Sequence, residues 1–260
     1  RAELLGRSVV AAGQVEFRIR SRYRLSEKST LLQDMIVYAD SKEVRFETLI
    51  DWQDEHRFLK TAFDTTVFAD EARQEVQFGY IRRPTTRNNA EEKAKFEVSN
   101  HKYTDLSETR YGAALLNDCK YGLSVEDAKM RLSLHKGGNR PDDRGDKGQH
   151  FCIYAFLPHQ GGFSAQNVIR PAYALNYRPV LLSGSIQQPS LLLVDADHVI
   201  AETVKPAESG EKAYVIRLYE AEGAAVRTKL HIHGTVKAVE ETDMLEEDGR
   251  LLFQAHYTNT

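Results

Sequence analysis

A polar loop between residues 136 and 150 gathers side chains that could bind a ligand. It holds three carboxylates among lysines and arginines and ends on a histidine, and the candidate contact residues are Lys136, Asp142, Asp143, Asp146 and His150. Carboxylates and glycines can form a calcium loop, but the spacing departs from D-x-[DN]-x-[DN]-G and the basic neighbours oppose a cation. A plain solvated loop and a loop that orients sugar hydroxyls both remain open.

Two histidines could bind a metal elsewhere in the chain. His231 and His233 are two residues apart on a predicted strand, so both would lie on the same face. A catalytic zinc ion takes three protein ligands, and the sequence shows no third ligand near this pair. We therefore expect exposed or hydrogen-bonded histidines and assign no metal site.

No catalytic residue can be assigned from the sequence. Asp51 lies beside Trp52, and sugars stack on indoles, but Trp52 continues an apolar series that predicts a core position. The 38 acidic residues allow many carboxylate pairs, and the pattern G-x-S-x-G is absent. The sequence alone cannot choose among these pairs, and a Ser-His-Asp triad cannot be argued.

Composition narrows the class of protein. The 260 residues are 41% hydrophobic and 28% charged, which is typical of a globular protein, and no apolar run approaches the roughly 18 residues of a membrane helix. The net charge is −3 with dispersed basic residues, so neither nucleic acid nor a membrane is an expected partner. Cys119 and Cys152 are predicted to be buried free thiols, which favours a reducing, cytoplasmic location.

The elements that must position these residues are β-strands. Apolar and polar residues alternate with a period of two over residues 15–19, 44–52, 76–80, 130–134, 214–218 and 228–232. Residues 151–157 are apolar on both faces, which predicts a central strand. Before the polar loop, Met130, Leu132 and Leu134 alternate with polar residues up to His135, so His135 is expected to face away from the core.

Helical periodicity is scarce, and residues 54–63 are the best candidate for a helix. Many strands separated by turn-rich segments predict an all-β fold, a large antiparallel β-sandwich. The stretch 205–212 is rich in turn residues. We therefore place a main sandwich domain at 1–204 and terminal hairpins or a small sheet at 205–260.

Two strings connect the chain to a known family. Residues 46–56 read Phe-Glu-Thr-Leu-Ile-Asp-Trp-Gln-Asp-Glu-His, and residues 116–122 read Leu-Asn-Asp-Cys-Lys-Tyr-Gly. Together with Arg83-Pro84-Thr85 and the segment 146–150, in this order, they resemble the C-terminal β domain of the glycoside hydrolase family 38 α-mannosidases, in the cytosolic or bacterial variant. The similarity runs from about Gln33 to about Glu247.

The resemblance implies a galactose mutarotase-like supersandwich in a retaining, zinc-dependent α-mannosidase. It implies that the zinc ligands and the catalytic carboxylates lie upstream of this chain, in an N-terminal catalytic domain on which this domain packs. It also implies that the loop after Leu134 lines the rim of the mannoside cleft, with Lys136 near the sugar. This chain alone is then expected to be inactive.

Other interpretations remain. An autonomous carbohydrate-binding module would need an exposed aromatic platform, and a structural or oligomerisation module would need an exposed apolar face. Relative to the family, the chain is expected to lack opening strands, and its end, residues 254–260, is expected to stop before the usual terminal strand. Exposed strand edges could then pair in a homo-oligomer.

Overall fold

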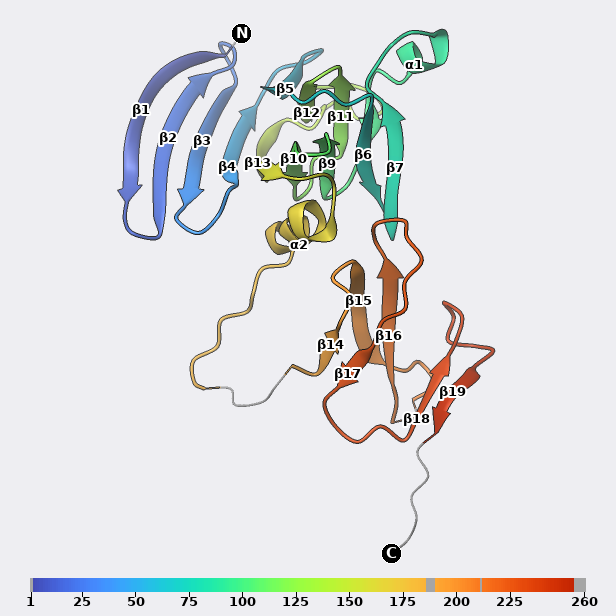
Figure 1. Cartoon of the computed structure of the whole chain (residues 1–260). Coiled ribbons are helices and arrows are strands. Elements are labelled where there is room, and N and C mark those ends of the chain that lie inside the picture. The colour runs from blue at the N-terminus through green and yellow to red at the C-terminus, as the bar shows by residue number, and fades with distance from the viewer. Residues whose placement is uncertain (1, 186–189, 211, 255–260) are drawn as a thin grey trace, which may run out of the picture. The chain divides into compact units, whose positions relative to one another are not determined.

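Antiparallel pairing joins distant segments into a nine-stranded sheet, shown in the computed structural model (Figure 1). The structure describes residues 2–185, 190–210 and 212–254, and the chain divides into two compact units, Arg1–Pro179 and Val180–Thr260. In the first unit the strand order of the large sheet is β1 (Glu3–Ala12), β2 (Glu16–Arg24), β3 (Thr30–Tyr38), β4 (Val44–Trp52), β13 (Gly148–Gln160), β10 (Tyr111–Asn117), β9 (Tyr103–Ser107), β6 (Glu71–Val76) and β7 (Gly79–Pro84).

A second, four-stranded sheet covers part of one face of the first. Its order is β5 (Phe58–Asp64), β12 (Lys129–Lys136), β11 (Gly122–Glu126) and β8 (Val98–Ser99). Side chains from both sheets form one core, including Ile50 and Leu115 from the large sheet and Met130 and Leu132 from the small one. Each such side chain contributes about 1.5–3 kcal/mol through burial. The predicted all-β sandwich is confirmed.

The central position predicted for residues 151–157 is also confirmed, because β13 lies between β4 and β10. On the outer face of the large sheet, a π-helix at Ala165–Ile169 and α2 (Arg170–Asn176) pack against strands of its centre. The short α1 (Ala90–Ala94) begins after Asn89, whose side chain accepts a hydrogen bond from the Glu92 amide.

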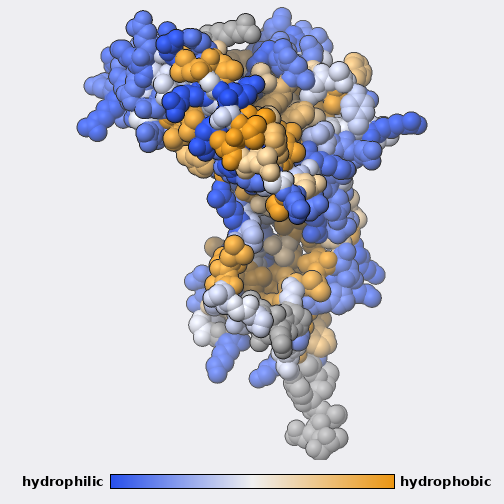
Figure 2. Space-filling model, turned by 90° about the vertical axis from the view of Figure 1, so that its left-hand side faces the viewer, coloured by the Kyte–Doolittle hydropathy of each residue, from blue (hydrophilic) through white to orange (hydrophobic). Residues whose placement is uncertain are grey.

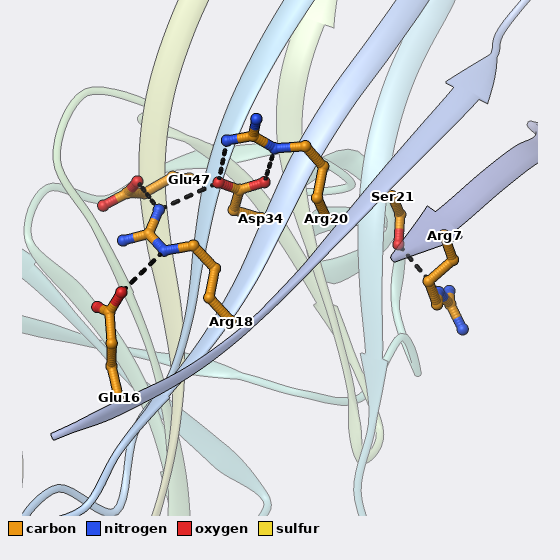
Figure 3. Close-up of polar contacts among 7 residues, drawn as sticks. All are labelled: Arg7, Glu16, Arg18, Arg20, Ser21, Asp34 and Glu47. Atoms are coloured by element: carbon orange, nitrogen blue, oxygen red, sulfur yellow. Dashed lines mark hydrogen bonds and ion pairs between the residues drawn. The ribbon is translucent and has the colours of Figure 1, made fainter. Parts of the chain in front are cut away.

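A network of ion pairs lies on the outer face of β2, β3 and β4 (Figure 3). Asp34 is only 5% exposed and accepts hydrogen bonds from Arg20 at 2.7 and 2.8 Å and from Arg18 at 3.1 Å. Arg18 also donates to Glu47 at 2.8 Å and to Glu16 at 3.3 Å. The network therefore ties three neighbouring strands together through side chains.

The second unit consists of two-stranded ribbons. They pair β14 (Leu192–Val194) with β17 (Leu230–Ile232), β15 (Val199–Pro206) with β16 (Tyr214–Glu220), and β18 (Ala238–Glu241) with β19 (Arg250–Gln254). The sequence-based boundary at 204/205 lies inside β15, and both β14 and β15 pair with strands beyond it. The compact unit instead begins at Val180. Residues 255–260, at the end that was expected to stop before the usual terminal strand, lie outside the described residues.

The helix predicted at 54–63 is wrong. Residues 58–64 form β5, which pairs with β12. Leu59 and Phe63 pack against the core, and their spacing of four satisfies a helix and a strand equally, because four is also a multiple of two. Pairing with a distant strand decided between the two.

The strand predicted at 76–80 is also wrong. Gln77 and Phe78 form the turn between β6 and β7, with Val76 opposite Gly79. Phe78 has a φ of +58° and is 52% exposed, so its side chain does not continue the apolar face of either strand. An alternating pattern alone does not reveal a two-residue reversal of the chain.

Candidate functional site: the loop between β12 and β13

The polar loop crosses from one sheet of the sandwich to the other. Lys136 is the last residue of β12 in the small sheet, and Gly148 is the first residue of β13 in the large sheet, opposite Trp52. The loop therefore lies at one end of the sandwich, where a rigid scaffold holds both of its ends.

The five candidate residues lie in different surroundings. Lys136, Asp142, Asp143 and Asp146 are exposed, and neither Lys136 nor Asp143 forms an ion pair among the described residues. Asp142 accepts a hydrogen bond from the Arg144 amide at 2.9 Å, which forms a local turn. His150 is half-buried, and its Nε2 lies 2.7 Å from the carbonyl oxygen of Asp146. The structure thus brings Asp146 and His150 together and leaves the other three at the surface.

Gly145 allows the loop to close on itself. Its φ is +61°, and a Cβ atom added there would lie 1.8 Å from the carbonyl oxygen of Gly138. Its amide donates to the Asp142 carbonyl at 3.2 Å. Only glycine can combine this backbone conformation with so close an approach.

Three aromatic rings underlie the two ends of the loop. The rings of Trp52 and His135 have centroids 4.8 Å apart, and those of His135 and His150 are 4.3 Å apart. We call Trp52, His135 and His150 the three-ring cluster. Trp52 is 2% exposed and His135 8%, so the predicted core position of Trp52 is confirmed.

His135 was expected on the outer face, and that expectation is wrong. The pairing of β12 with β5 shifts its register between Ser133 and His135, so Leu134 and His135 are both buried. A β-bulge of this kind places consecutive residues on the same side of a sheet. Simple alternation could not reveal the cluster, and the only local signal was a histidine at the strand end.

Burial also determines the charge of His135. Desolvation, with a smaller Coulombic contribution from His150, lowers the pKa of His135 to about 4. His135 is therefore neutral near pH 7.

Two surface contacts tie the loop to the segment after β4. Lys147 pairs with Glu55 and lowers the pKa of that carboxyl, and the Asn139 amide lies 3.3 Å from His56 Nε2.

The histidines and cysteines singled out in the sequence do not form a metal site in the described part of the chain. His231 Nε2 contacts Asp195 at 2.7 Å, and among the residues with described coordinates no group of three or more His, Cys, Asp or Glu side chains could hold a metal ion. Cys152 is buried as predicted, whereas Cys119 is exposed, because it follows the end of β10. In the described part of the chain no helix is long and apolar enough to cross a membrane.

The arrangement of the loop suits the binding and orientation of a polar ligand. The surface of the loop offers an ammonium group and carboxylates for hydrogen bonds to hydroxyls. The buried rings of Trp52 and His135 beneath it offer a rigid base.

Comparisons with known proteins agree on one family. A family model described as the glycosyl hydrolases family 38 C-terminal domain matches residues 6–144, and a second, described as the glycosyl hydrolases family 38 C-terminal beta sandwich domain, matches residues 198–256. Human alpha-mannosidase 2C1 is 40% identical over 229 residues, which are 86% of this chain and 22% of the human protein.

Other relatives give the same result. Alpha-mannosidase of Saccharomyces cerevisiae is 31% identical over 253 residues, 90% of this chain and 23% of the yeast protein. The chain thus spans about a fifth of the length of these relatives. A crystal structure of a glycosyl hydrolase family 38 protein from Enterococcus faecalis has a TM-score of 0.78 at 13% identity, over 95% of this chain and 34% of that one, which is a similarity of fold.

Proposed function

Because this chain belongs to the family of glycosyl hydrolase family 38 C-terminal domains, we propose that it is the non-catalytic C-terminal part of a retaining, zinc-dependent α-mannosidase. The relatives named above are α-mannosidases several times longer than this chain, which leaves room for a separate catalytic domain. The described residues hold no group suited to zinc. In this proposal zinc and the catalytic carboxylates lie in the rest of the parent protein.

In this proposal the loop between β12 and β13 shapes the rim of the mannoside cleft. Lys136 has no carboxylate partner among the described residues, so its ammonium group can donate to a sugar hydroxyl. The same loop carries three carboxylate acceptors, Asp142, Asp143 and Asp146. The His150 side chain packs on His135 at the base of the loop and contacts the Asp146 carbonyl oxygen. These residues bind and orient the mannoside, and the bond-breaking step belongs to the parent protein's catalytic domain.

An apolar row indicates where the rest of the parent protein would pack. Phe46, Met35, Ile19 and Val9 are direct cross-strand neighbours on four successive strands, running from the core to the edge of the sheet. Phe46 packs against the core, whereas Val9 is 56% exposed, because the small sheet does not reach β1. Figure 2 faces the β1 side and shows apolar surface among polar side chains. We propose that the parent protein's catalytic domain covers this row.

The observations do not favour an independent carbohydrate-binding module. Trp52, the one tryptophan of the sequence, lies in the core and cannot serve as an exposed platform. A purely structural module shares the apolar row with our proposal and differs in predicting no effect of the loop on catalysis. Two free cysteines agree with a cytoplasmic location, which we also propose.

Hydrolysis of an aryl α-mannoside tests the proposal. We expect turnover by the full-length parent protein and none by this chain, with or without added zinc. Zinc-dependent turnover by this chain alone would mean that its own side chains form a catalytic centre.

Within the parent protein, Lys136→Ala tests the role of the loop. Loss of one charge-assisted hydrogen bond, worth about 1.5–3 kcal/mol, predicts a fall in kcat/KM of about 10- to 100-fold. Lys129→Ala, at the other end of β12 and paired with Asp64, is the control and should leave kcat/KM unchanged. Unchanged kinetics in Lys136→Ala would remove the loop from the cleft.

A further inference from the structure

The two ends of the β12–β13 loop meet on the same buried rings. At the first end, the ring of His135 packs on those of Trp52 and His150, and Gly137 lies against the Nε1 edge of the indole. A Cβ atom at Gly137 would lie 2.6 Å from Trp52 Nε1 and 2.4 Å from the Asp54 carbonyl oxygen. At the second end, His150 contacts the carbonyl oxygen of Asp146 at 2.7 Å. The ring cluster is thus in contact with residues on both sides of the exposed loop.

The cluster also joins the two sheets at this end of the sandwich. Trp52 and His150 come from β4 and β13 of the large sheet, and His135 comes from β12 of the small sheet. Backbone hydrogen bonds continue the link, because the Gly137 amide donates to Arg57 at 2.9 Å and the His56 amide donates to Gly137 at 2.8 Å. A change at His135 therefore affects the base of the loop without touching its exposed candidate residues.

Ring packing holds His135 against Trp52 and His150, and His150 is also held by its contact with the Asp146 carbonyl oxygen. Neither Trp52 Nε1 nor His135 Nε2 has a hydrogen-bond partner among the described residues, although both atoms are buried. A ring of similar size without nitrogen should therefore support the loop as histidine does, whereas a methyl group should not. This difference separates the role of the ring from the role of its protonation.

We propose that Trp52, His135 and His150 are positioning residues that fix the β12–β13 loop and, through it, the place of Lys136. The positioning of the loop by the cluster is a property of this chain. An effect of the positioned loop on sugar binding rests on the function proposed above.

Limited trypsin digestion of this chain tests the positioning role directly. The loop offers cleavage after Arg144 and Lys147, both exposed. We expect His135→Ala to raise the rate of cleavage at these bonds about tenfold and His135→Phe to keep it within about twofold of the wild-type rate. Ile50→Val, a mild truncation on the same face of β4 as Trp52, is the control for a general loss of stability. Equal cleavage of His135→Ala and Ile50→Val would overturn the proposal, as would rapid cleavage of His135→Phe.

Kinetics of the parent protein then distinguish the positioning of the loop by the cluster from the contribution of the loop to sugar binding. A positioned loop that binds sugar predicts that His135→Ala raises KM about tenfold, changes kcat less than about threefold, and is rescued by His135→Phe. A loop opened by His135→Ala with unchanged KM would keep the positioning role and reject the loop as part of the mannoside cleft.

Discussion

Asp34 of β3 links two strands by binding Arg18 and Arg20 of β2, and Arg18 extends the network to Glu47 of β4. Hydrogen bonds from Arg20, joined by Arg18, lower the pKa of Asp34 below its ordinary value of 3.8. A carboxyl group with a lowered pKa in the folded state stabilises the protein above the unfolded pKa, and this stabilisation is lost as pH falls through the folded pKa. The network therefore supports the sheet at neutral pH and weakens in acid.

The variant Asp34→Asn should lower the free energy of unfolding by about 2 kcal/mol at pH 7, because two arginines lose their carboxylate. The difference from wild type should shrink as pH falls below about 3.8, where Asp34 of the unfolded chain takes up a proton, and should vanish below the lowered pKa of the folded state. Urea unfolding at pH 7 and pH 3 measures both values. Asp40→Asn, an exposed residue after β3, is the control. An equal difference at both pH values would contradict the assigned role.

The two thiols should react slowly in the folded protein. Burial raises the pKa of Cys152 to about 12. Partial desolvation of its thiol together with the Asp118 carboxylate raises that of Cys119 to about 12, although Cys119 is exposed as a residue. Because the thiolate is the reactive form, a disulfide reagent at pH 8 should modify both thiols more than about a hundredfold more slowly than free cysteine. Asp118→Asn should accelerate Cys119. Rapid reaction of either thiol before unfolding would contradict these pKa values.

At the scale of elements, the bulge in β12 and the glycines after it determine the shape of the candidate site. The bulge turns His135 inward, Gly137 lets the chain pass the indole, and Gly145 closes the loop against Gly138. Each step depends on the one before it, because the exposed residues can only be placed once the base of the loop is fixed.

Gly145→Ala should strain or open the loop. The positive φ and the 1.8 Å approach to the Gly138 carbonyl oxygen leave no room for a methyl group, and a cost of about 1–3 kcal/mol is expected. Gly138→Ala is a matched control, since its nearest neighbour atom would be 4.0 Å away. Thermal unfolding and trypsin cleavage after Arg144 measure the effect. Similar behaviour of the two variants would mean that the loop does not depend on Gly145.

At the scale of the whole molecule, the large sheet extends beyond its small partner. The row from Phe46 to Val9 begins in the core and ends exposed, so one face of β1 and β2 offers apolar surface that the described small sheet does not cover. Such a surface is typical of a domain that packs on another part of a longer protein.

Val9→Lys should weaken the binding of this chain to the separately produced preceding region of the parent protein by at least about tenfold. Its free energy of unfolding should change by less than about 0.5 kcal/mol, because Val9 is exposed. Ser8→Lys, on the opposite face of β1 beside Arg20, is the control. Isothermal titration calorimetry measures the binding, and thermal unfolding measures the change in stability. Undiminished binding of Val9→Lys would place the interface elsewhere.

Much of the architecture was predictable from local patterns. A period of two over many short segments predicts an all-β sandwich, and the apolar stretch 151–157 predicts the central strand β13, because alternation and burial are recorded along the chain itself. The ordered strings 46–56 and 116–122 were sufficient to indicate the family.

The remaining features depend on contacts between residues far apart in sequence. Residues 54–63 fit a helix as well as a strand until β12 pairs with them, and His135 faces inward only because that pairing contains a bulge. The cluster of Trp52, His135 and His150 joins three strands from two sheets, and Asp34 meets arginines from a neighbouring strand. Local periodicity indicates which residues prefer burial. Only the tertiary structure decides which of them contact one another, because strand register and sheet packing are set by partners far away in the sequence.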